Sequence, residues 1–109
     1  MEVYQKNEII AILSGCLLGK ICSNVRMVAL DFNMNFSWLK MCCYTDTQPD
    51  KKNFELMEDA VALYISYGNN YEIDFDLSVE FSDKPFGELE VQQDILHHRY
   101  ILYARYEKQ

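Results

Sequence analysis

The alternation of residues 71–81 constrains the fold more than any other feature of this chain. Apolar residues occupy the odd positions: Tyr71, Ile73, Phe75, Leu77, Val79 and Phe81. Polar residues occupy the even positions between them: Glu72, Asp74, Asp76, Ser78 and Glu80. Because successive side chains of a strand point to opposite faces, a period of two predicts a strand with one apolar face and one acidic face. The chain is therefore expected to build a sheet.

Other segments show the patterns of two helices and three more strands. Residues 3–18 and 51–67 have the apolar spacing of amphipathic helices, with Gly19 placed to end the first and Thr47 or Asp50 to cap the second. Residues 25–32 and 36–45 are predicted strands of a hairpin closed by residues 33–35. Residues 95–106 predict a closing strand. Residues 82–94, which hold Pro85, Gly87 and many acids, predict a long loop.

This order of elements, helix, strand, strand, helix, strand, strand, predicts an α+β fold. We expect a two-layer sandwich in which residues 1–109 form a single domain. Its four-stranded, mainly antiparallel sheet would contain two hairpins and carry both helices on one face. The other face would then be exposed and would display the acids of residues 71–81, with Trp38, Lys40 and Tyr44 as neighbours.

The negative charge of the chain is concentrated in one segment. The formal net charge is −7, and residues 71–94 hold eight acids against one base, Lys84, so the rest of the chain is neutral. A local negative potential of this kind repels nucleic acid and anionic membranes and attracts basic surfaces. We therefore expect a basic protein partner and no direct binding to nucleic acid or membrane.

The sequence contains no motif typical of an enzyme or of a cofactor site. It has no glycine-rich phosphate loop, no Gly-x-Ser-x-Gly elbow and no His-Glu-x-x-His motif. His97 and His98 are adjacent, so a strand would point them to opposite faces. We expect no catalytic residue, no metal and no cofactor. A Cys-His pair, or a divalent cation held by two carboxylates of the acidic strand, remains an alternative.

Four cysteines and the lack of long apolar runs predict a cytoplasmic protein. Cys16, Cys22, Cys42 and Cys43 form no Cys-x-x-Cys pair, and free thiols, mostly buried, are the simplest interpretation. No run of eighteen apolar residues is present, and the N-terminus lacks the pattern of a secretory signal.

Four stretches of the chain carry a resemblance to a known family. They are Leu-Leu-Gly-Lys-Ile-Cys-Ser-Asn-Val-Arg-Met-Val at 17–28, Tyr-Thr-Asp-Thr-Gln-Pro at 44–49, Val-Glu-Phe-Ser-Asp-Lys-Pro at 79–85 and Ile-Leu-Tyr-Ala-Arg-Tyr-Glu at 101–107. With its Leu-Leu-Gly-x-Ile turn, Asn-x-Arg strand start, Tyr-x-Asp-x-x-Pro helix entry and final Tyr-x-Arg-x-Glu strand, the chain resembles small acidic bacterial immunity proteins of polymorphic or contact-dependent inhibition toxin systems. The motifs describe turns and strand ends and carry no reactive group.

The resemblance implies an antitoxin that binds a cognate toxin domain, and a nuclease toxin would present a basic cleft to phosphates. We expect carboxylates to bind that cleft, with aromatic side chains as anchors. The predicted partner-binding residues are Glu72, Asp74, Asp76, Glu80, Asp83, Glu88, Glu90, Trp38 and Phe86. The alternative roles of the two aromatic residues are packing across strands for Trp38 and pinning of the loop to the core for Phe86. The protein would act as a monomer or a homodimer. The alternatives are a structural or adaptor module that forms a homodimer, and a small metal-dependent hydrolase.

Overall fold

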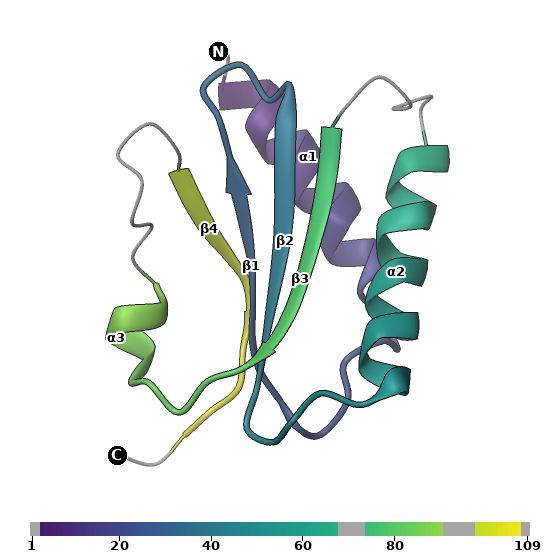
Figure 1. Ribbon diagram of the computed structural model, residues 1–109. Helices are drawn as coiled ribbons and strands as arrows, with labels where there is room; N and C mark the ends of the chain where they lie inside the picture. The colour runs from purple at the N-terminus through teal and green to yellow at the C-terminus, as the bar shows by residue number, and fades with distance from the viewer. Residues whose placement is uncertain (1–2, 68–73, 91–97, 108–109) are drawn as a thin grey trace.

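The computed structural model describes residues 3–67, 74–90 and 98–107, which form four strands and three helices (Figure 1). In chain order the elements are α1 (Val3–Cys16), β1 (Val25–Phe32), β2 (Trp38–Thr45), α2 (Lys51–Ser66), β3 (Asp74–Phe81), α3 (Phe86–Leu89) and β4 (His98–Ala104). Each predicted helix and strand is present, with ends shifted by a few residues. Residues 71–73 and 95–97 of the predicted strands lie outside the described residues.

The sheet has the strand order β3-β2-β1-β4 and is mixed. β1 pairs antiparallel with β2, which confirms the first hairpin, and β1 also pairs antiparallel with β4. β3 instead pairs parallel with β2, so the prediction of a second hairpin is wrong. The reason is the path of the chain: α2 carries it back along the sheet, as a parallel connection requires, and the next strand in the chain, β4, lies at the opposite edge of the sheet.

The main core lies between the sheet and the two long helices, which share one face of the sheet (Figure 1). Apolar residues of α1 and α2 meet alternate residues of the strands there, and the fully or nearly fully buried ones include Leu13, Leu17, Val28, Leu30, Leu39, Met41, Cys43, Met57, Ala60, Tyr64 and Val79. Val28 and Leu30 of β1 and Leu39, Met41 and Cys43 of β2 thus form the inward face of the hairpin.

A second, smaller cluster covers part of the opposite face. Met27 and Ala29 of β1 pack there with Cys42 and Tyr44 of β2 and with Leu89 of α3. Because of this packing β1 is buried along its whole length. The expectation that the face opposite α1 and α2 is open is therefore wrong where α3 lies, since the predicted loop of residues 82–94 contains a helical turn that packs on the sheet.

The ends of the helices follow the predicted local chemistry. Asp50 caps α2 by accepting a hydrogen bond from the Asn53 backbone N–H at 3.0 Å, and the Asp50 backbone N–H donates to Asn53 Oδ1 at 3.0 Å. The buried Asn53 side chain also bonds Asn24, just before β1, which ties the start of α2 to the sheet. Gly19 follows α1 with a φ of 78°, a backbone conformation that glycine adopts without strain.

Candidate protein-binding surface

The even-numbered residues of β3 point away from α1 and α2. Leu77 and Val79 pack in the main core, so the residues between and beside them project from the other face. Asp74, Asp76 and Glu80 are all exposed there. The structure thus confirms the acidic face of this strand, while Glu72 lies outside the described residues.

Two residues of β2 are the neighbours of these acids across the parallel ladder. Trp38 is the partner of Asp74, and Lys40 is the partner of Asp76. The half-buried Trp38 indole N–H donates a hydrogen bond to Asp76 Oδ2 at 2.9 Å. The sheet therefore brings the predicted aromatic residue Trp38 together with the predicted acids of β3.

Arg26 binds the start of residues 82–90, which we call the acidic segment. Its Nη1 donates hydrogen bonds to the backbone carbonyls of Ser82 at 2.8 Å and Lys84 at 2.9 Å. Its guanidinium also lies over the ring of Phe86, 4.9 Å from the centroid. The Glu107 carboxylate pairs with the other two nitrogens of the same guanidinium, each at 2.8 Å. The mostly buried Arg26 thus joins β1, the acidic segment and the C-terminal stretch.

Arg99 holds the end of the same segment. It donates to the carbonyl of Leu89, the last residue of α3, and pairs with both carboxylate oxygens of Asp31 at 2.6 and 2.9 Å. The side chains of Arg99 and Asp31 are only 8% and 4% exposed. The hydrogen bond to Asp31 raises the pKa of Arg99, and the guanidinium also lies over the Tyr44 ring at 5.6 Å. This is a buried, bidentate ion pair.

The two arginines bind the backbone of residues 82–90, and the carboxylates of this segment are exposed to solvent. Asp83, Glu88 and Glu90 are exposed. In the described parts of the chain, the ion pairs of Arg26, Arg99 and Arg105 involve Glu107, Asp31 and Asp46, none of which belongs to the acidic segment. The acids of β3 thus project from a strand that is paired with β2, and those of residues 82–90 from a backbone that is hydrogen-bonded to Arg26 and Arg99. We call Asp74, Asp76, Glu80, Asp83, Glu88 and Glu90 the acidic surface.

Sequence reasoning missed Arg26, Arg99 and Asp31 as the residues that place this surface. A signal exists, because Arg26 and Asp31 stand inside an otherwise apolar predicted strand. A charged residue in such a strand is either at an edge or paired, and pairing across 68 residues, as in Arg99 and Asp31, is visible only in the folded chain.

Phe86, the second predicted anchor, has a different environment from Trp38. It is half-buried, packs against the cluster of Met27, Cys42 and Leu89, and contacts Arg26. This contact fastens the start of α3 to the sheet. Its role in partner binding stays a prediction.

The pairing of Glu107 predicts how stability depends on pH. Hydrogen bonds from Arg26 and then Arg105 lower the pKa of Glu107 from 4.5 to about 2. Because the folded-state pKa is the lower one, this pair contributes stability that is fully present above about pH 4.5 and is lost as pH falls toward 2. In urea unfolding, the stability difference between the wild type and Glu107→Gln should shrink over that range. Glu88→Gln, at an exposed position, is the control, and a difference independent of pH would contradict this assignment.

The described residues hold no arrangement typical of a reactive centre. They contain no group of three His, Cys, Asp or Glu side chains able to hold a metal ion. All four cysteines are free, and burial raises the pKa of the Cys42 and Cys43 thiols to about 12. Both thiols are therefore protonated and poorly nucleophilic at neutral pH.

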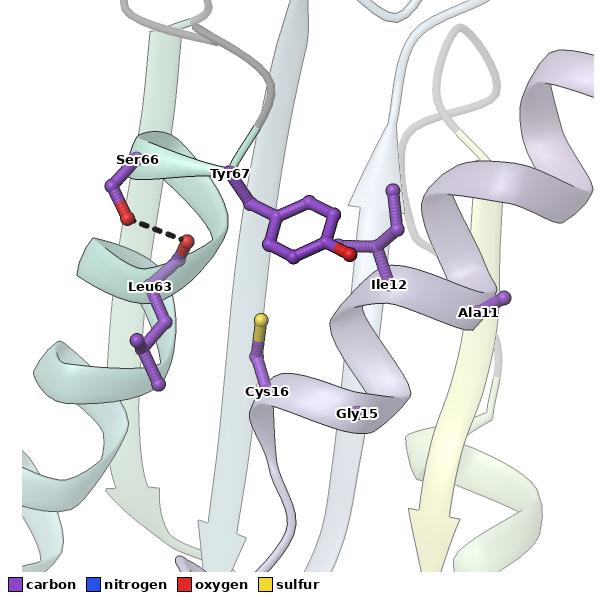
Figure 2. Close-up of a pocket in the computed structure, with 7 residues that line it drawn as sticks. All are labelled: Ala11, Ile12, Gly15, Cys16, Leu63, Ser66 and Tyr67. Atoms are coloured by element: carbon purple, nitrogen blue, oxygen red, sulfur yellow. Dashed lines mark hydrogen bonds between the residues drawn. The ribbon is translucent and has the colours of Figure 1, made fainter.

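An apolar groove of about 510 Å³ lies between α1 and α2, on the side away from the acidic surface. Its lining residues are Ala11, Ile12, Gly15, Cys16, Leu63, Ser66 and Tyr67. Figure 2 shows Tyr67 reaching from the end of α2 toward α1. The Ser66 hydroxyl donates a hydrogen bond to the Leu63 carbonyl at 3.0 Å. Among the described residues that line this groove, none has a charged side chain.

Together these features define a small α/β protein whose distinctive surface is an exposed, firmly placed set of carboxylates. None of the helices in the described ranges has the length and apolar character needed to cross a membrane. Residues 6–107 match the family model of the MafI2 immunity proteins, and the chain belongs to that family. This membership confirms the resemblance to immunity proteins and assigns a toxin-neutralising function. No curated protein matches the chain.

Proposed function

We propose that this protein neutralises a nuclease toxin by covering the toxin's basic surface with the acidic surface. A nuclease has to attract phosphates with lysine and arginine, so its nucleic-acid cleft is a natural target for carboxylates. The proposal extends the family membership, which gives toxin neutralisation without naming the toxin's activity or the surface used.

The observation that carries the proposal is that two arginine side chains bind the backbone of residues 82–90, which contains Asp83, Glu88 and Glu90 of the acidic surface. Arg26 and Arg99 bind the carbonyls of Ser82, Lys84 and Leu89, so the backbone is in place before a partner arrives. A surface that is already ordered loses less conformational entropy on binding. The ion pairs of Arg26, Arg99 and Arg105 within the described residues involve other carboxylates, so these arginines leave the charge of the acidic surface available to a basic protein.

Trp38 is the anchor that this geometry favours. It lies beside Asp74 and Asp76 on the exposed part of the sheet, and its ring offers apolar area at low entropic cost. Glu72, which lies outside the described residues, stays a predicted partner-binding residue. Binding of this kind needs no catalysis, so the protein acts as a stoichiometric inhibitor and not as an enzyme.

Mixing the protein with the toxin domain encoded by the gene immediately upstream is expected to give a one-to-one complex. The association rate should fall steeply as salt rises, because steering by opposite charges is screened within about 10 Å at 0.1 M salt. Stopped-flow binding between 50 and 500 mM NaCl measures the rate, and titration of nuclease activity gives the stoichiometry. Absence of a complex, or inhibition at substoichiometric amounts, would refute the proposal.

A further inference from the structure

The outer edge of β3 has unpaired backbone groups in the described part of the chain. β3 ends the sheet, because the strand order is β3-β2-β1-β4. The Asp74 N–H bonds the Ser37 carbonyl and the Ser82 N–H bonds the Thr45 carbonyl, so the even-numbered residues direct their backbone groups toward β2. Backbone groups alternate sides along a strand. Those of Phe75, Leu77, Val79 and Phe81 therefore point outward, away from β2, which is the one strand that β3 pairs with among the described residues.

This edge is unusually suited to accept another strand. Its register with β2 runs without a shift from Trp38–Asp74 to Thr45–Phe81, and it holds no proline. The opposite edge, β4, has a register shift against β1, a device by which proteins discourage strand pairing. Of the two edge strands, β3 is the one whose pairing with its neighbour has no register shift, so it is the better template for an added strand.

The side chains of β3 decide which strand fits. On one face an added strand would lie beside Asp74, Asp76 and Glu80, and on the other beside Phe75, Leu77 and Phe81, which is 43% exposed. Like charges on directly opposed strands destabilise a sheet, whereas opposite charges stabilise it. A second copy of β3 would set carboxylates against carboxylates. A segment that alternates basic and apolar residues complements both faces.

We propose that β3 binds its partner by strand addition: an extended segment of the toxin, with lysine or arginine at alternate positions and apolar residues between them, pairs with the outer edge of β3. Backbone hydrogen bonds give the register, and the alternating side chains give the specificity. This inference rests on the proposed function, since it names the part of the toxin that the acidic surface recognises.

Amide hydrogen exchange of the intact protein, free and in complex with the upstream-encoded toxin domain, tests this inference. In the free protein the amides of Asp76, Ser78 and Glu80, which face β2, should exchange slowly, and those of Phe75, Leu77 and Val79 quickly. In the complex the second set should slow by about 100-fold or more, because hydrogen-bonded amides exchange only on opening. The first set is the internal control.

Each outcome discriminates. Slowing of the odd-numbered amides supports strand addition. A stoichiometric complex in which they still exchange quickly overturns strand addition and leaves the proposed function standing, since the acids would then bind through their side chains alone. Protection that is present without toxin and rises with protein concentration assigns the edge to a second copy and overturns the inference. If no complex forms, both the inference and the proposed function fail.

Discussion

Replacing Arg99 with leucine is expected to lower the free energy of unfolding by about 3–5 kcal/mol, the usual cost of removing one partner of a buried ion pair. In the wild type the Asp31 carboxylate is 4% exposed and bonds Arg99 at 2.6 and 2.9 Å. The substitution removes the guanidinium that pairs with this buried carboxylate. A further side-chain hydrogen bond to Asp31 comes from the Cys42 thiol at 3.5 Å, which is a weak donor. Urea unfolding at pH 7, followed by circular dichroism, measures the loss.

Two variants separate this cause from a general loss of packing. The double variant Asp31→Leu and Arg99→Leu removes both charges and should recover most of the stability, because an apolar pair of similar size can replace a buried ion pair. Lys51→Ala removes the exposed pair with Glu55 and should change stability by less than about 0.5 kcal/mol. If Arg99→Leu is as mild as Lys51→Ala, the buried pair does not stabilise the fold.

Reversing Asp74 and Asp76 to lysine is expected to slow association with the toxin by about 100-fold, well inside the range that electrostatic steering covers. Both side chains are exposed on β3, and Asp76 accepts the Trp38 indole bond at 2.9 Å, so the change alters charge and disturbs the neighbouring anchor together. Dissociation should also accelerate if the lysines face basic residues of the toxin. Surface plasmon resonance at low salt gives both rates.

The matched control carries the same change of charge on the other side of the molecule. Glu55→Lys and Glu58→Lys reverse two exposed acids of α2, which packs on the face opposite the acidic side chains of β3. Their effect on association should be small, and both proteins should be checked for equal folding by circular dichroism. Equal slowing by the two pairs of substitutions would remove β3 from the interface.

Local patterns predicted the elements and their faces well. The alternation of residues 71–81 correctly placed Leu77 and Val79 inside and Asp74 and Asp76 outside, because a period of two follows directly from strand geometry. The cap of α2 at Asp50 and the turn at Gly19 followed from equally local chemistry. The acidic surface was thus visible in the sequence as a set of residues.

The arrangement of the strands was harder to predict. A hairpin between β3 and β4 was expected because neighbouring strands often pair, yet β3 runs parallel to β2 and β4 lies beside β1. Backbone hydrogen bonds are the same for every residue type, so periodicity tells which face is buried but not which strand is adjacent. The choice of neighbouring strand depends on how the connections between the strands, such as α2 between β2 and β3, are placed on the sheet.

The sequence by itself determined the identity of the acids, their alternation and the faces of the strands, since these depend only on neighbouring residues. Only the tertiary structure decided that residues 82–90 form an ordered part of the surface. The contacts responsible join Arg26 and Arg99 to backbone carbonyls 10 to 58 residues away. Every residue has a backbone carbonyl, so the sequence does not tell which one an arginine binds. The folded chain alone brings these partners within hydrogen-bond distance.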